Sequence, residues 1–240
     1  LEILKQNKFL PSLIITSPDA KKGRGLQMQA SPVAVFAEKN NIPCLKPEKL
    51  DTEEIWDILR TLGSRKCTGS TFLNGDGQRK FSTENFSGEQ NIPDFFCVVA
   101  YGKIMPEKII HMPKFGSINI HYSLLPKYRG ASPVESAILN GDTETGVTIQ
   151  KMAFKMDSGP IIVQEKTKIL PDEKTPDLRK RLIKMGGELL AKTITKITKS
   201  SIKEISQDEK HASYCKKIKK EEGLIDLNAD AIMNYNKFRA

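Results

Sequence analysis

Asn119 and His121 are the two residues of this chain whose types and spacing best suit chemistry at a carbonyl carbon. They alternate with Ile118 and Ile120 in a strand-like pattern, so the two polar side chains share one face. An amide can donate a hydrogen bond to a developing oxyanion, and an imidazole can move a proton. The alternative, on these residues alone, is a capped strand end with a hydrogen-bonded histidine.

Predicted strands and helices alternate along the part of the chain that must position this pair. This alternation predicts an α/β fold, with a mostly parallel sheet flanked by helices. The apolar run 95–100 suits a parallel strand that is covered on both faces. Segments 146–152 and 161–169 are expected to form an antiparallel pair of strands. Sites in such sheets lie beyond the carboxyl ends of strands, so we expect chemistry in the loops after 95–100 and after His121.

The chain divides into regions of different composition. Residues 1–199 form the predicted N-terminal domain, in which 20–31 is expected to be a loop and about 63–90 a long loop or an inserted hairpin. The lysine-rich segment 200–215 is predicted to be a linker. Residues 216–240 are predicted to begin a second domain that the sequence does not complete.

Charge and cysteine content narrow the class of protein. The net charge of +9 suits a polyanionic partner such as a nucleic acid, and the alternative is a merely solubilising surface. No apolar run approaches the length of a membrane span, so no membrane partner is expected. The four cysteines lack metal-ligand spacing, Cys97 is predicted to be a core residue, and a reducing, cytoplasmic setting fits best.

Several motifs together closely resemble those of the folate-dependent formyltransferases. They are Asn119-Ile120-His121, Ser123-Leu124-Leu125-Pro126, 127–133, 141–148 and 156–160. Four further stretches make the chain most similar to the family members that act on methionyl-tRNA. These are Pro18-Asp19 with 23–25, Ser31-Pro32-Val33, 99–102 with Met105-Pro106, and 214–217 with 221–226.

The resemblance implies three catalytic residues. Asn119, His121 and Asp157 match the family's catalytic trio. Their chemistry agrees with this role, because Asn119 can donate to the formyl oxygen while His121 stabilises the same oxyanion. Asp157 would orient the imidazole ring and stabilise its charge. In isolation, Asp157-Ser158-Gly159 would be ordinary turn chemistry.

The resemblance also implies where the substrates bind. The folate-binding residues would be Ser123, Leu124, Leu125, Pro126, Val99, Ala100, Tyr101, Gly102 and Ile104. The tRNA-binding residues would be Arg24, Lys127 and Arg129. The alternative for each of these basic residues is an ordinary solvated side chain. No metal is implied, and residues 216–240 would start a C-terminal tRNA-binding domain.

The implied activity is transfer of a formyl group from 10-formyltetrahydrofolate to the amine of initiator methionyl-tRNA, in translation initiation. We expect a monomer in the cytoplasm, or in an organellar matrix if the source is eukaryotic. The alternatives are an amino-sugar formyltransferase and an inactive RNA-binding fragment. The family's first strand has no counterpart before Leu1, so the chain is expected to be incomplete.

Overall fold

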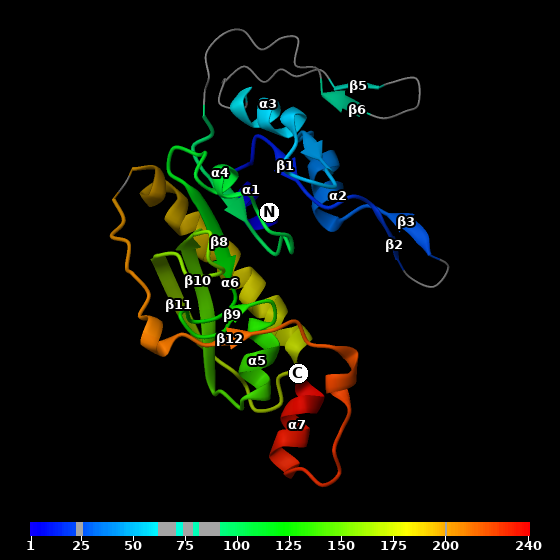
Figure 1. Cartoon of the computed structure of the whole chain (residues 1–240), viewed down its shortest axis with the longest axis vertical. Coiled ribbons are helices and arrows are strands. Elements are labelled where there is room, and N and C mark those ends of the chain that lie inside the picture. The colour runs from blue at the N-terminus through cyan, green and yellow to red at the C-terminus, as the bar shows by residue number, and fades with distance from the viewer. Residues whose placement is uncertain (23–25, 62–70, 74–78, 82–91, 200) are drawn as a thin grey trace.

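A computed structural model describes residues 1–22, 26–61, 71–73, 79–81, 92–199 and 201–240. Its main sheet has four strands in the order β11-β10-β8-β7 (Figure 1). They are β7 (Phe96–Val98), β8 (Ser117–His121), β10 (Glu144–Lys151) and β11 (Ile161–Lys168). β7 runs parallel to β8, whereas β10 runs antiparallel to both β8 and β11. The α/β class and the predicted antiparallel pair are confirmed.

A smaller parallel pair of strands carries its own helices. β1 (Ile14–Ile15) pairs with β4 (Cys44–Leu45), and none of the described strands joins this pair to the main sheet by a ladder. α2 (Pro32–Lys39) connects the two strands, and Ser31 caps it by accepting a hydrogen bond from the Ala34 N–H. α3 (Glu53–Thr61) follows β4. Its apolar side chains join an apolar cluster that also includes residues of β1 and β7, so the two sheets share this packing.

The segment 20–31 was predicted to be a loop, and this prediction is wrong. β2 (Ala20–Lys22) and β3 (Gln27–Gln29) form an antiparallel hairpin in which Lys21 lies opposite Met28. The β3 side chains are all exposed, and the three-residue strand carries a single apolar residue, Met28, which is too short a pattern to predict a strand. Within 63–90, β5 (Thr71–Leu73) and β6 (Arg79–Phe81) pair as a hairpin, and the rest of that stretch lies outside the described residues.

The main core lies between the sheet and the long helix α6 (Thr175–Thr198). The helix begins at Thr175 and has Pro176 and Asp177 in its first turn, as predicted. The predicted cap by the Thr175 hydroxyl is wrong, because the N-cap residue is Lys174 and no side chain caps the helix. Leu178, Leu182 and Leu190 of this helix and Ile118, Val147 and Ile149 of the sheet are almost completely buried. Gly186 allows close contact, since a Cβ there would lie 3.0 Å from a methyl carbon of Ile120.

The other helices are shorter. α1 (Glu2–Gln6) packs against α6, α4 (Glu107–Ile110) precedes β8, and α5 (Pro133–Leu139) follows it. Cys97 does not lie in the core as predicted: its side chain is exposed, on a strand at the edge of the main sheet. None of the helices in the described ranges is long and apolar enough to span a membrane.

The segment predicted to be a linker, 200–215, is packed onto the domain where it is described. Ile205 forms a backbone bridge with Ile161 at the start of β11. After the short 3-10 helix η1 (Glu209–His211), β12 (Tyr214–Cys215) pairs in parallel with β9 (Arg129–Gly130). The chain continues through η2 (Lys220–Gly223) to α7 (Ala231–Arg239), which lies against α5 (Figure 1).

Truncation of Leu182 to alanine tests the central packing. Leu182 is fully buried between α6 and the sheet, whereas the next residue, Ile183, is half exposed. We expect Leu182→Ala to lower the free energy of unfolding by about 2–5 kcal/mol, because it removes buried methyl groups and leaves a cavity. Ile183→Ala should change it by only about 0.5 kcal/mol. Urea unfolding of both variants measures this, and equal losses would contradict the assigned core.

Candidate active site

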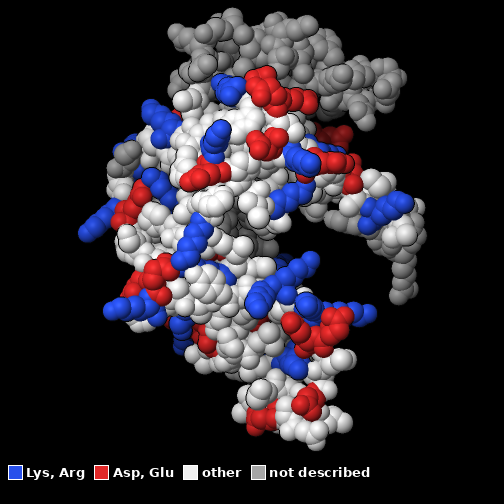
Figure 2. Space-filling view, viewed as in Figure 1, with Lys and Arg blue, Asp and Glu red and all other residues white. Residues whose placement is uncertain are grey.

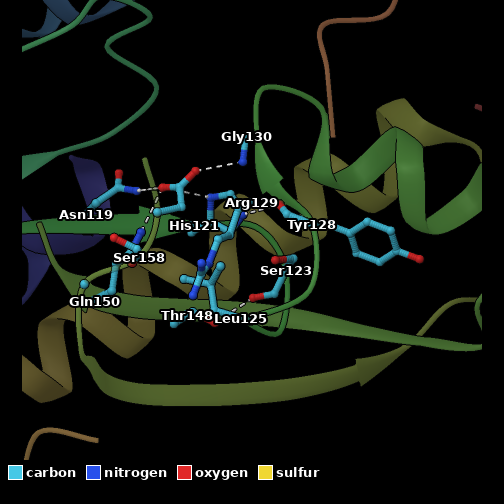
Figure 3. Close-up of polar contacts among 12 residues, drawn as sticks. Asn119, His121, Ser123, Leu125, Tyr128, Arg129, Gly130, Thr148, Gln150 and Ser158 are labelled. Atoms are coloured by element: carbon cyan, nitrogen blue, oxygen red, sulfur yellow. Dashed lines mark hydrogen bonds and ion pairs between the residues drawn. The ribbon is translucent and has the colours of Figure 1, made fainter. Parts of the chain in front are cut away.

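The structure brings together the three residues that the sequence predicted as catalytic. β8 places Asn119 and His121 on one face, as their spacing requires (Figure 3). Asp157 lies in the loop between β10 and β11, which brings its carboxylate against both side chains. Its Oδ1 lies 3.3 Å from Asn119 Nδ2 and 3.6 Å from His121 Nδ1. An amide, an imidazole and a carboxylate therefore meet at one point.

The orientation of His121 is fixed by a backbone carbonyl. His121 Nε2 lies 2.8 Å from the carbonyl oxygen of Tyr128, and a carbonyl can only accept. Nε2 therefore carries a hydrogen, which leaves Nδ1 facing the Asp157 carboxylate. The histidine is only 5% exposed, so neither nitrogen is simply solvated. A proton on Nδ1 would lie directly against a carboxylate oxygen.

The Asp157 carboxylate has further donors. Oδ2 accepts a hydrogen bond from the Gly130 N–H at 2.8 Å, and Oδ1 accepts one from Gln150 Nε2 at 2.9 Å (Figure 3). Asp157 adopts a left-handed backbone conformation with φ of 50°. Gln150 was not singled out from the sequence. A signal was present in the sequence: Gln150 alternates with Val147 and Ile149 and so lies on the opposite face of the strand from them. In the structure it is buried, and the register places it opposite Asn119.

Arg129 was predicted to contact tRNA, and the structure places it elsewhere. Its side chain is fully buried, so it is not the exposed basic residue that the prediction required. Its guanidinium donates to Gln207 Oε1 at 2.8 and 3.0 Å and to both carboxylate oxygens of Glu209 at 2.8 and 3.1 Å. It also reaches the Tyr214 hydroxyl at 3.3 Å. Arg129 thus fastens 207–214 to the site, and we do not retain it as a tRNA contact.

Glu209 is held as a carboxylate by two cations. Hydrogen bonds from Arg129 and from Lys155 lower the pKa of Glu209 from 4.5 to about 2. The same contact with Glu209 is the main cause of the raised pKa of the Arg129 guanidinium. This pair links the loop of Asp157, through Lys155, to the segment after Ile205.

The predicted folate loop is held rigidly by hydrogen bonds from the sheet. The Ser123 hydroxyl donates to the Lys127 carbonyl at 2.6 Å, which closes the loop internally. Thr148 of β10 donates its hydroxyl hydrogen to the Ser123 carbonyl at 2.6 Å and accepts the Leu125 N–H at 3.2 Å. Leu125 is 3% exposed and belongs to the interior, whereas Leu124 and Pro126 are half-buried. Lys127 is exposed.

The other predicted folate residues follow β7. Because β7 and β8 are parallel, residues 99–104 leave the sheet at the same edge as His121. Val99 and Ile104 are exposed apolar side chains there, with Ile104 86% exposed. Ala100 and Gly102 are exposed and Tyr101 is half-buried. Arg24 lies outside the described residues.

No cluster of three or more histidine, cysteine, aspartate or glutamate side chains suited to a metal occurs in the part of the chain that the structure describes. The donors around Asp157 are amides, a backbone N–H and an imidazole. The described site is therefore an arrangement of hydrogen-bonding groups around one carboxylate, suited to proton transfer and oxyanion stabilisation.

Comparison with known proteins identifies the family of proteins to which a chain with this fold and this trio belongs. Residues 4–194 match the formyl transferase family, so the chain belongs to this family. It is 37% identical to the methionyl-tRNA formyltransferase of Thermotoga sp. (strain RQ2), over 100% of this chain and 67% of that protein. It is 38% identical to the methionyl-tRNA formyltransferase of Buchnera aphidicola subsp. Schizaphis graminum (strain Sg), with the same coverage. The chain thus spans about two thirds of the length of these relatives.

Solved structures show the same fold. A phosphoribosylglycinamide formyltransferase from Anaplasma phagocytophilum has a TM-score of 0.61 and 20% identity, covering 90% of this chain and 91% of that one. An N-formyltransferase from Helicobacter canadensis, in complex with folinic acid and dTDP-3-aminofucose, has a TM-score of 0.60 and 19% identity, covering 96% and 80%. At these identities the likeness concerns the fold alone.

The ion pair of Glu209 predicts how stability depends on pH. Since the pKa in the folded protein is about 2, below the ordinary 4.5, the ionised carboxylate stabilises the fold. This contribution is complete above pH 4.5 and is lost as the pH falls toward 2. We expect Glu209→Gln to lower the unfolding temperature at pH 7, with the difference from the wild type shrinking between pH 4.5 and pH 2.

Thermal unfolding of wild type and variant across this pH range measures the effect. Glu221→Gln, at an exposed position in η2, is the matched control and should follow the wild type at every pH. A wild type-to-variant difference that stays constant down to pH 2 would contradict the assigned role of the Glu209 carboxylate.

Proposed function

We propose that this protein transfers the formyl group of 10-formyltetrahydrofolate to the amino group of methionyl-initiator-tRNA. The observation that carries the proposal is the meeting of Asn119, His121 and Asp157 at the end of β8. The names of the relatives at 37–38% identity support this choice of acceptor. Translation initiation in the cytoplasm, or in an organellar matrix, is the corresponding setting.

Asn119 is oriented to stabilise the developing negative charge. Its Nδ2 must face Asp157, because a carboxylate accepts hydrogen bonds and an amide oxygen cannot donate them. One hydrogen of this NH₂ group is directed at Asp157 Oδ1, and the second remains to bind the formyl oxygen. Attack of the amine on the formyl carbon moves an electron pair onto that oxygen, where the hydrogen bond strengthens.

His121 and Asp157 provide the proton chemistry. The new bond joins the amine nitrogen to the formyl carbon, and the bond that breaks joins this carbon to the folate nitrogen. The amine loses a proton, and the folate nitrogen gains one. His121 Nδ1, facing Asp157, is placed to take up and return a proton, and the carboxylate stabilises the charged ring.

The choice of tRNA as the acceptor is supported by the charge of the protein surface. Basic side chains surround a hollow between the part of the molecule with α2 and the β2–β3 hairpin and the part with α5 and α7 (Figure 2). Together with the net charge of +9, this suits a polyanionic acceptor such as the end of a tRNA. Lys127, exposed beside the predicted folate loop, is a candidate contact.

Replacement of Asn119 by alanine tests the oxyanion donor. One such donor typically contributes about 10²–10³ in kcat, so we expect Asn119→Ala to reduce kcat by this factor. Stopped time courses with formyl-folate and charged initiator tRNA measure the rate. Asn7→Ala, at the end of α1, is the control and should retain the wild-type rate. A near wild-type kcat for Asn119→Ala would exclude the assigned role.

The identity of the acceptor is tested in two parallel reactions. The protein is given formyl-folate with charged initiator tRNA in one reaction and formyl-folate with a nucleotide-linked amino sugar in the other. Formylation of the methionyl-tRNA alone is the expected result. Formylation of the sugar but not of the tRNA would overturn the proposed acceptor, and folate binding without transfer to either would indicate an inactive RNA-binding protein.

A further inference from the structure

Gln207 lies in the segment that the sequence predicted as a linker, yet its side chain touches the loop of Asp157. We propose that Gln207 is a positioning residue for formyl transfer: it holds the Asp157 peptide in the conformation that aims the carboxylate at Asn119 and His121. This inference rests on the function proposed above. Gln207 contacts no reacting atom and acts only through Asp157.

The contacts of Gln207 join two backbone carbonyls of this loop. Gln207 Nε2 donates to the carbonyl of Asp157 at 2.8 Å and to that of Gly159 at 2.7 Å. Gln207 Nε2 also lies 3.3 Å from Oε1 of Gln150, and the NH₂ group of Gln150 donates to the Asp157 carboxylate. One amide thus fixes the peptide of Asp157 and supports a second amide that contacts its carboxylate.

The polarity of the Gln207 amide is dictated by its partners. Its Oε1 faces Nε and Nη2 of Arg129, at 3.0 and 2.8 Å, and a guanidinium can only donate. Its Nε2 faces carbonyl oxygens, which can only accept. Neither end can be reversed. Arg129 is fully buried and anchored to Glu209, so it supplies a fixed point for Gln207.

The Asp157 backbone needs such a restraint. Its φ of 50° lies in the left-handed region, which aspartate tolerates better than most residues but does not prefer, so the surrounding contacts must select this conformation. Rotation of this peptide would carry the carboxylate away from the Gly130 N–H. The loop is also tight at Gly159, where a Cβ would lie 1.9 Å from the Lys151 carbonyl oxygen. The hydrogen bonds of Gln207 hold the loop in this conformation.

The variant Gln207→Glu isolates this role. It preserves the size of the side chain and an oxygen for Arg129, but it replaces the NH₂ group with an acceptor that faces two carbonyl oxygens. A displacement of about 1 Å can cost about 100-fold in rate, so we expect kcat to fall roughly 10- to 100-fold. The KM for formyl-folate should change less than about twofold, since the loop at Ser123 is held by Thr148 instead.

A pH profile separates positioning from a merely structural effect. When the introduced carboxyl becomes protonated, its O–H can again donate to a carbonyl. Arg129 faces this carboxyl and favours its ionised form, so the ratio of variant to wild-type kcat should rise only toward the acid end of the assay range. Gln207→Met, which cannot donate at any pH, should show a reduced kcat and a flat ratio. Gln207→Met also tests the inference if Gln207→Glu does not fold. Gln6→Glu, exposed in α1, is the matched control.

A crystal structure of Gln207→Glu makes the test independent of the proposed function. We expect the Asp157 loop to shift and the carboxylate to lose the Gly130 N–H. Unchanged kcat in both Gln207 variants, or an unmoved Asp157 in the crystal, would overturn the inference. Absence of formyl transfer in the wild-type protein would overturn the proposed function, while the crystal structure would still decide the role of Gln207.

Discussion

The carboxylate of Asp157 is the constraint on which the rest of the site depends. It is only 13% exposed, and it accepts hydrogen bonds from the Asn119 and Gln150 amides and from the Gly130 backbone. A shielded carboxylate is costly unless such donors surround it. Satisfying it therefore fixes two strands, the loop after β8 and the backbone of Asp157 itself in one relative geometry.

The fold explains how these donors come together. The antiparallel register of β8 and β10 sets Asn119 opposite Gln150, and the parallel pairing of β9 with β12 holds the chain around Gly130. Formyl transfer needs an oxyanion donor and a proton carrier at fixed positions, because these groups act by preorganisation. The packing of α6 against the sheet supplies the rigid support.

The sequence was most informative where the relevant interactions are local. The spacing of Asn119 and His121 was enough to place them on one face, and the start of α6 followed from the proline and the acid of its first turn. The burial of Arg129 could not be predicted, because its partners lie about eighty residues away and become neighbours only when β12 pairs with β9. The exposure of Cys97 likewise depends on the position of β7 at the edge of the main sheet. Local patterns report on strand faces and on where helices begin, whereas these positions depend on tertiary pairing.

The most direct test of this account is the transfer rate of Asp157→Asn. The amide keeps the shape of the carboxylate but turns an NH₂ group toward donors, and it removes the charge beside His121. We expect kcat to fall at least about 100-fold, as for other losses of preorganised charge, with folate binding by fluorescence unchanged. A kcat near that of the wild type would show that the Asp157 carboxylate is not what organises this site.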